Sequence, residues 1–467
     1  MNHTELTKAL ALQRSAYQAL PVPDYTSRCA DLKKLQQFLS DHKDAICTAI
    51  SADYGHRSRH ETMLFEIIPA QSGVDHALKH LKRWMRPQSR AVDRKAFGLA
   101  SNRVVPQPLG VVGVITPWNF PINLSFTPLA AIFAAGNRAM VKLSENSRHL
   151  AQLLIEKIPA YFPPEKLLFI DETGGVGQIF SGLSFDHLLF TGSGTTGRLV
   201  MAAAAQNLCP VTLELGGKSP ALVLDDFDLQ TAASRILYVK FANAGQICTT
   251  VDHVYVPRAK VAEFVGLCQS MVKARYPSLA SPDYTAIIND SAYTRLMQTL
   301  EQARADGSEV VNLMGGDMSD PSTRKIAPHA VVNPDANSTL MQREIFGPIL
   351  PIVPYDSVQA VVTAINAKPR PLAFYPFTND PALIDDLLNQ VMSGGVSIND
   401  ALFHVGQHDL PFGGVGESGM GHYHGREGFE TFSKMRPIFH QSRWAMTRLL
   451  LPPYGKSIER ILSFLTR

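Results

Sequence analysis

Apolar and polar positions follow two different periods along the chain, and the change falls near residue 104. Before it, residues 4–20, 29–52 and 61–85 carry apolar side chains every three or four positions with few breakers, which predicts helices. A polar, basic stretch at 86–94 interrupts this pattern. The N-terminal part of the chain is therefore expected to be helical.

After residue 104, short runs rich in β-branched residues alternate with helical stretches. This alternation is typical of β-α-β units, which form a mostly parallel sheet with helices on both faces. The expected fold class is therefore α/β with a doubly wound parallel sheet. The runs that predict strands are 111–116, 138–143, 166–170 and 185–190, and those that predict helices are 126–135 and 149–158.

A glycine-rich segment, TGSGTTG (191–197), lies between the last of these strands and the helical run that follows. Gly192, Gly194 and Gly197 spell GxGxxG, and a backbone without side chains lets a pyrophosphate approach the free N–H groups of a helix N-terminus. An ordinary glycine-rich turn is the alternative interpretation. Glu214 stands near the place of a ribose-binding acid, but its surroundings favour another role.

Composition and charge narrow the class of protein. A chain of 467 residues is long enough for two or three domains. Its 44 basic and 41 acidic residues are scattered without a long basic run, which argues against a nucleic-acid partner. The N-terminus lacks the apolar stretch of a secretory signal, and no run approaches the length of an integral membrane span.

The cysteines and histidines suggest neither disulfides nor a metal site. Five cysteines, at positions 29, 47, 209, 248 and 268, form no CxxC pair and suit a reducing compartment, so a cytoplasmic location is expected. The histidines at 404, 408, 422 and 424 lack a recognised zinc spacing. We therefore expect them to be surface or interface residues.

Six segments in this order and spacing resemble the aldehyde dehydrogenase superfamily, and the match covers most of the chain. Within the superfamily the chain is similar to the shorter, class 3-like branch, and its ending PFGGVGESGMGHYHGREGFETFSK resembles bacterial coniferyl aldehyde dehydrogenases. The segments are ITPWNFP (115–121), FTGSGTTG (190–197), LELGGKSP (213–220), FANAGQICTT (241–250), EIFGP (344–348) and PFGGVGESGMG (411–421).

The resemblance implies NAD(P)-dependent oxidation of an aldehyde to a carboxylic acid through a thiohemiacetal and a thioester. An aromatic or hydroxycinnamyl aldehyde such as coniferaldehyde is the expected substrate, and medium- or long-chain aliphatic aldehydes are the alternative. A thiol hydrolase that pairs Cys248 with His253, a relative that hands its thioester to coenzyme A, and a non-catalytic relative are further alternatives. The glycine-rich phosphate loop argues against the first and Glu214 against the second. The presence of Asn119, Glu214, Cys248 and Glu344 together argues against the third.

Three residues are candidates for catalysis. Cys248 is the nucleophile, and because a free thiol is mostly protonated at neutral pH, the site has to lower its pKa or remove the proton through a base. A buried, inert cysteine is the alternative. Asn119 resembles the side-chain donor to the oxyanion, with the Cys248 backbone N–H as its partner. Glu214 resembles the base that activates water, and its apolar neighbours predict a raised pKa.

The cofactor residues follow from the same resemblance, and they favour NAD while leaving NADP open. Glu145 would accept hydrogen bonds from the adenosine ribose and repel a 2′-phosphate, whereas Lys142 would tolerate one. Glu344 would hold the second ribose and Phe346 would pack near the nicotinamide ring. Trp118 and the loop residues Gly192, Ser193 and Gly197 complete the set.

The resemblance also implies the domain organisation and a homodimer or homotetramer. A Rossmann-like cofactor domain, an α/β catalytic domain and a small oligomerisation bridge with a strand at 96–105 are expected. The tail has apolar residues Ile458, Ile461, Leu462 and Leu465 at helical spacing with basic Lys456, Arg460 and Arg467, which suits packing on its own or a sister subunit better than a membrane surface. The divisions are 1–85 with 107–213 (cofactor), 214–397 (catalytic), 86–106 with 431–442 (bridge), 398–430 (return to the cofactor domain) and 443–467 (tail).

Overall fold

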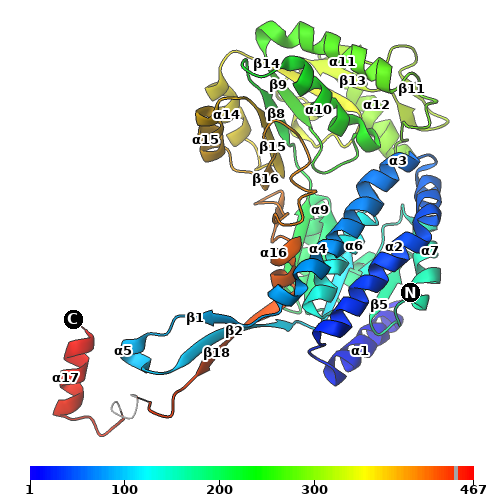
Figure 1. The fold of residues 1–467 in the computed structure, drawn as a ribbon. Coiled ribbons are helices and arrows are strands. Elements are labelled where there is room, and N and C mark those ends of the chain that lie inside the picture. The colour runs from blue at the N-terminus through cyan, green and yellow to red at the C-terminus, as the bar shows by residue number, and fades with distance from the viewer. Residues whose placement is uncertain (446–450, 467) are drawn as a thin grey trace.

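The computed structural model describes residues 1–445 and 451–466, and its first α/β unit is built on a six-stranded sheet (Figure 1). The strand order is β17-β7-β6-β3-β4-β5, in which β3 to β7 run parallel and the edge strand β17 runs antiparallel. The strands are β3 (Val111–Ile115), β4 (Arg138–Lys142), β5 (Leu167–Ile170), β6 (His187–Gly192), β7 (Val211–Leu215) and β17 (Gly419–Met420).

Helices cover both faces of this sheet. Val112 and Val114 of β3 point into a core with α2, α4, α6, α7 and α16, whereas Val111 and Ile115 point into a core with α1, α8 and α9. This arrangement confirms the doubly wound parallel sheet. The helices are α1 (His3–Ala19), α2 (Tyr25–Tyr54), α3 (Arg59–Thr62), η1 (Met63–Ile67), α4 (Ile68–Trp84), α6 (Asn123–Ala135), α7 (Arg148–Lys157), η2 (Ile158–Ala160), α8 (Val176–Ser181), α9 (Gly194–Ala205) and α16 (Gly425–Thr431).

The second α/β unit contains a seven-stranded sheet in the order β10-β13-β14-β9-β8-β15-β16, parallel except for β10. Helices α10, α11 and α12 pack on one face, and α14 and α15 on the other. The strands are β8 (Pro220–Val223), β9 (His253–Pro257), β10 (Glu309–Asn312), β13 (His329–Val332), β14 (Ile349–Tyr355), β15 (Ala373–Phe377) and β16 (Gly395–Val396), with β11 (Ser319–Asp320) and β12 (Lys325–Ile326) as a separate pair. The helices are α10 (Leu229–Phe241), η3 (Ala242–Gly245), η4 (Arg258–Lys260), α11 (Val261–Arg275), α12 (Asp290–Ala305), α13 (Thr339–Gln342), α14 (Val358–Asn366) and α15 (Pro381–Gln390).

A three-stranded antiparallel arm of β1 (Gln88–Arg90), β2 (Ser101–Pro108) and β18 (Ser433–His440) protrudes from the first unit (Figure 1). The polar stretch at 86–94 was not expected to form a strand, yet β1 pairs with β2, because a short exposed strand needs no apolar alternation. The strand expected at 96–105 is wrong in its first residues. α5 (Arg94–Phe97) precedes β2, which begins where its partner β18 ends.

Two further elements differ from the expected pattern. The helix expected at 61–85 contains the π-helical turn η1, a wider turn that is common near functional sites. β7 ends at Leu215, two residues beyond the boundary expected at 213, so Glu214 belongs to the first sheet.

The chain ends in α17 (Lys456–Leu465), which lies near the tip of the arm (Figure 1). Its Ile458 is buried and its Leu462 is half exposed. Arg467 of the expected tail lies outside the described residues. In the part of the chain that the structure describes, none of the helices combines the length and the apolar character that crossing a bilayer requires.

Candidate active site

A cavity of about 220 Å³ lies where the two units meet. Its walls come from the carboxyl ends of β3, β6 and β7 and from two loops of the second unit, at the edge where doubly wound sheets bind ligands. Lys142, Glu145 and Gly197 are not among its lining residues. The other eight of the eleven candidate residues line it: Trp118, Asn119, Gly192, Ser193, Glu214, Cys248, Glu344 and Phe346.

Cys248 follows a turn of unusual backbone conformation. Asn243, Ala244 and Gly245 have positive φ angles of 49°, 51° and 75°. A Cβ on Gly245 would lie 2.3 Å from the carbonyl oxygen of Gly347, so only glycine fits at this position. Such a strained segment persists only where its surroundings hold it firmly, which keeps the thiol in a fixed place.

The side chain of Gln246 supports this turn from within. It is buried, and its Nε2 donates to the carbonyl oxygens of Asn243 (2.9 Å) and Ala286 (3.1 Å). Its Oε1 accepts from the backbone N–H of Ile288 at 3.0 Å. The sequence motif includes Gln246, but nothing in the sequence indicates that its role is to brace the turn of the nucleophile.

The electrostatic surroundings of Cys248 oppose ionisation. Burial, with the nearby carboxyl groups of Glu344 and Glu214, raises the pKa of the thiol to about 12, and hydrogen bonds from Thr249 only partly offset this rise. Of the two routes to a thiolate that the sequence left open, these surroundings do not favour a pKa lowered by the protein. Poor solvation and two nearby acids disfavour a thiolate. The thiol can therefore ionise only if a base removes its proton or if a ligand brings a positive charge close to it.

Glu214 is the penultimate residue of β7, paired in register with Thr191 of β6 and Gly419 of β17. Its side chain is 2% exposed, and neither carboxyl oxygen has a hydrogen-bond partner among the residues that the structure describes. Burial raises its pKa well above the usual value. A carboxyl group of this kind, at the wall of a cavity, is free to exchange a proton with a molecule that enters.

Asn119 is held by a buried ion pair that the sequence analysis did not single out. The backbone carbonyl of Asn119 accepts from Arg57 Nη1 at 2.8 Å, and its side-chain Nδ2 donates to the carbonyl of Gln246 at 3.3 Å. Arg57 pairs with Glu66 at 3.0 Å, and both side chains are fully buried. The only available signal was a charged residue, Glu66, within the apolar run MLFEIIPA.

Glu344, Phe346 and Trp118 form the opposite side of the cavity. A Cβ on Gly216 would lie 2.2 Å from Glu344 Oε2, so this glycine lets the carboxylate lie against the backbone. Glu344 Oε1 is buried without a partner, and burial, then Asp252, raise the pKa of this group to about 8. The rings of Trp118 and Phe346 meet edge to face at 5.5 Å. An apolar slot beside an acid with one free oxygen suits a flat ring that carries a hydroxylated sugar.

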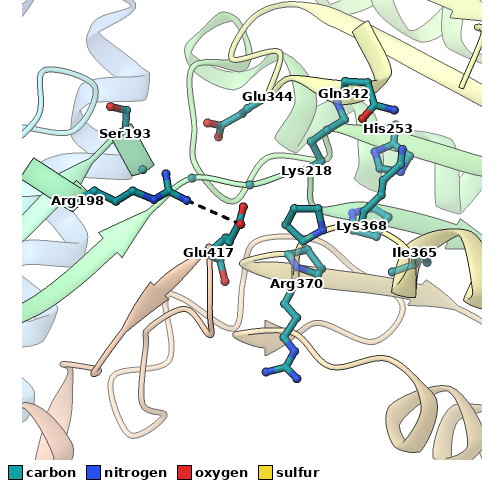
Figure 2. A pocket seen from close by; sticks show the side chains of 17 residues that line it. Ser193, Arg198, Lys218, His253, Gln342, Glu344, Ile365, Lys368, Arg370 and Glu417 are labelled. Atoms are coloured by element: carbon teal, nitrogen blue, oxygen red, sulfur yellow. Dashed lines mark ion pairs between the residues drawn. The ribbon is translucent and has the colours of Figure 1, made fainter. Parts of the chain in front are cut away.

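A second cavity, of about 240 Å³, adjoins the first and shares Ser193, Gly216 and Glu344 with it (Figure 2). Ser193 begins α9, whose first turn presents free backbone N–H groups, and its hydroxyl accepts from Thr196 N at 3.2 Å. Figure 2 shows Arg198 and Glu417 joined across this space, at 3.8 Å. Together the two cavities form an elongated space along the phosphate loop, which fits a dinucleotide.

The three remaining candidates lie outside the first cavity. Gly197 packs under Leu215, whose Cδ2 would be 2.7 Å from a Cβ at that position, so it serves close packing of α9 on β7. Lys142 ends β4, and its ammonium forms an ion pair with Glu172. Glu145 is exposed and its carboxylate accepts from Ser144 Oγ at 3.2 Å.

Comparison with known proteins identifies the family. Residues 1–438 match the family described as aldehyde dehydrogenases. The chain belongs to the aldehyde dehydrogenase family. It is 43% identical over 465 residues to the coniferyl aldehyde dehydrogenase of a Pseudomonas species, a match that covers 99% of this chain and 96% of that protein.

Two further matches support the same family. Aldehyde dehydrogenase family 3 member B1 of Homo sapiens is 38% identical over 456 residues, covering 96% of this chain and 95% of that protein. The structure of Staphylococcus aureus AldH in a substrate-bound state is 33% identical, with a TM-score of 0.93 over 100% of both chains. The protein is thus an NAD(P)-dependent aldehyde dehydrogenase, and the family resemblance inferred from the motifs is confirmed.

The structure does not place His253 beside Cys248, as the hydrolase alternative requires. His253 is buried, its Nδ1 faces Asp252 Oδ1 at 3.3 Å, and it lines the second cavity instead of the one that contains Cys248. Burial lowers its pKa to about 4. A thiol–histidine pair is therefore not what the aldehyde dehydrogenase site presents.

The histidines near the C-terminus are only partly surface residues. His422 is exposed as expected, but the expectation is wrong for His424, which is buried. The chain turns at this point with a positive φ of 122° and places the His424 ring against Phe412 and His408, at 5.4 and 5.8 Å. This burial lowers the pKa of His424 to about 3.

Proposed function

We propose that this aldehyde dehydrogenase oxidises an aromatic or hydroxycinnamyl aldehyde, such as coniferaldehyde, with NAD and through a thioester on Cys248. The observation that carries the proposal is the presence of Cys248, Asn119 and Glu214 around one cavity that adjoins the phosphate loop. A scaffold without activity has no need for a nucleophile, an amide donor and a buried acid at one place.

In the first step the Cys248 thiolate adds to the aldehyde carbonyl, and the resulting thiohemiacetal carries a negative charge on oxygen. The amide of Asn119 and the backbone N–H of Cys248 are the proposed donors to that oxygen, and loss of one such donor costs about 10²–10³ in rate. NAD supplies the hydride acceptor when it is bound. Glu344 and Phe346 are the residues proposed to hold its nicotinamide half.

The thioester that remains has to be hydrolysed, and we assign that step to Glu214. Its carboxylate would take a proton from a water molecule, which then attacks the acyl carbon and releases the acid. The burial of Glu214 supports this role, because a raised pKa brings a carboxyl group closer to the pH at which the enzyme works. The same burial keeps bulk water away from the thioester.

One support for the proposed preference for NAD, with NADP left open, is Glu145. Its exposed carboxylate accepts only weak, local hydrogen bonds, from Ser144 Oγ at 3.2 Å and from Asn146 Nδ2 at 3.5 Å. It is therefore available to the hydroxyl groups of a ribose. A 2′-phosphate at the same place would be repelled by its charge.

A row of aromatic side chains supports an aromatic substrate over an aliphatic one. Phe120, next to Asn119, and Ile247, next to Cys248, belong to one small apolar cluster. From Phe120 the row continues through Phe65 (6.3 Å) and Tyr238 (6.1 Å) to Phe403 (6.3 Å, nearly parallel). Aromatic rings add about 0.5–1.5 kcal/mol per stacked or edge-on pair beyond area burial.

The test is a panel of aldehydes, from benzaldehyde and coniferaldehyde to long-chain aliphatic ones, followed by the absorbance of reduced cofactor with NAD and with NADP. We expect the highest kcat/KM for the aromatic members with NAD. Cys248→Ala should abolish oxidation, whereas Cys29→Ala, at another half-buried thiol, should not. Higher kcat/KM for aliphatic aldehydes would overturn the substrate, and turnover by Cys248→Ala would overturn the thioester.

We also infer that the arm joins two or four copies of the chain. β18 is an edge strand with unpaired backbone groups, and Phe439 on it is 49% exposed. Phe97 and Leu99, at the same end of the arm, are also exposed. Sedimentation that gives a monomer at micromolar concentration would contradict this inference.

A further inference from the structure

The ammonium of Lys142 is neutralised by Glu172, an acid that belongs to none of the sequence motifs. Lys142 ends β4, and Glu172 follows β5, the neighbouring strand of the sheet. Their charged groups form an ion pair, with the side chains 8% and 15% exposed. Because the pair is largely removed from water, it is screened much less than a surface pair.

Glu172 is held in place by the backbone of the next helix. The N–H of Gly177, in α8, donates to Glu172 Oε2 at 3.0 Å. A Cβ on Gly177 would lie 3.0 Å from that oxygen and 3.3 Å from Lys142 Nζ, so a side chain there would crowd the pair. Glu172 is therefore positioned on Lys142 by the fold and is not a mobile surface acid.

The pair lies beside the part of the sheet where a dinucleotide places its adenosine ribose. In doubly wound folds this ribose lies at the carboxyl end of the strand that follows the first β-α unit, which here is β4. A cavity of about 820 Å³ lies at the ends of β4 and β5, and Ser144, Arg148 and Glu172 are among its lining residues. Its charged lining residues are Arg148, Glu156, Asp171 and Glu172, of which Glu156 and Glu172 are paired with Lys157 and Lys142.

We propose that Glu172 favours NAD over NADP by neutralising Lys142, the buried cation at the end of β4. A 2′-phosphate needs a cation that is free to receive it, and Lys142 is not free while Glu172 is ionised. The inference rests on the proposed function, since it requires a dinucleotide in this cleft.

The test is Glu172→Gln, which keeps an acceptor for Gly177 N–H and removes the charge. We expect the affinity for NADPH to rise by about tenfold to a hundredfold, since one repulsive charge is removed and one cation is released. The affinity for NADH should change by less than about threefold, because it carries no 2′-phosphate. Both are measured by titrating the fluorescence of the reduced cofactor, and kcat/KM with NAD and NADP provides the second readout.

The matched control is Glu156→Gln. Glu156 lines the same cavity, but its side chain is 62% exposed and paired with Lys157. The same loss of charge should therefore leave the affinity for NADPH nearly unchanged. In the double variant Glu172→Gln/Lys142→Gln the gain should disappear, because the receiving cation is gone.

The outcomes separate the two proposals. If wild type binds neither NADH nor NADPH, the proposed function fails. If wild type binds NADH but Glu172→Gln gains no affinity for NADPH, or if Glu156→Gln gains as much, the role of Glu172 is overturned while the function stands. If the glutamine variant does not fold, the affinities for NADH and NADPH are measured with Glu172→Ala instead.

Discussion

Replacing Glu214 with glutamine should separate hydride transfer from hydrolysis. The carboxyl group has 2% exposure and no hydrogen-bond partner on either oxygen, and the amide is almost the same size, so the cavity should keep its shape. The amide cannot accept the proton of an attacking water. Hydride transfer should proceed once, and the acyl group should then remain on Cys248.

The expected magnitude follows from the assigned role. A positioned general base contributes about 10²–10⁴ in rate, which corresponds to about 3–5 kcal/mol of activation free energy. Steady turnover of Glu214→Gln should fall by that factor, while the first turnover keeps its rate. The burst should release one equivalent of reduced cofactor per Cys248.

The burst is measured as the stopped-flow absorbance of reduced cofactor at a known micromolar concentration of enzyme. Mass spectrometry of the same samples detects the trapped acyl-enzyme. Glu301→Gln, at an exposed acid of α12 outside the linings of both cavities, is the control and should turn over like wild type. Steady turnover at the wild-type rate by Glu214→Gln would remove this residue from its role. A variant with no burst at all would move Glu214 to an earlier step.

Stability gives an independent check on the same substitution. The pKa of Glu214 is raised in the folded protein, so the group binds its proton more tightly there than in the unfolded chain. Its contribution to the free energy of unfolding is therefore present at low pH and is lost as the pH rises above the usual carboxyl range. Glu214→Gln should lose this dependence and unfold at a higher temperature than wild type in alkaline buffer.

Three other predictions concern the residues that present the thiol. Because the pKa of Cys248 is about 12 without a ligand, inactivation by iodoacetamide should rise about tenfold per pH unit from neutral to mildly alkaline pH, and a plateau near the ordinary thiol pKa would refute the burial argument. Arg57→Gln leaves Glu66 buried without its partner and should cost about 3–5 kcal/mol in urea unfolding, whereas an unchanged midpoint would show that the pair is replaceable. Gly245→Ala, at a φ of 75° and with its Cβ 2.3 Å from Gly347 O, should lose at least about 1–3 kcal/mol of stability and slow the burst more than it weakens cofactor binding. A burst at the wild-type rate would contradict that expectation.

Local pattern was sufficient to predict strands β3 to β6 of the first sheet and the glycine-rich loop after β6, but not β7 or β17. Each of the strands β3 to β6 is a short, nearly continuous apolar run, because both of its faces are covered by helices. Strand β1 has three polar residues and depends wholly on its pairing with β2, so no local signal indicates it. The motif residues could be assigned to one site because their types and order are specific.

The charge pairings could not be predicted, because each depends on how separate elements meet in the folded chain. Lys142 and Glu172 meet across neighbouring strands, and the Arg57–Glu66 pair lies beneath the backbone of Asn119. The rise in the pKa of Cys248 has the same origin, since Glu214 and Glu344 approach the thiol only in the folded chain. A sequence indicates which groups are present, but the pKa of each depends on burial and on partners from other elements.

The proposed nucleophile and its proposed base come from different units, so the relative placement of the units determines whether they can act together. Glu214 lies in the first sheet, whereas the turn that carries Cys248 belongs to the second unit. A single buried acid of the first unit, Glu61, bridges them. Its Oε1 accepts from the backbone N–H of Asn243 in that turn at 2.9 Å, and its Oε2 accepts from Thr285 Oγ1 at 2.5 Å. The strained turn is therefore held from across the interface, and any movement between the units would displace the thiol from the acid that has to release its product.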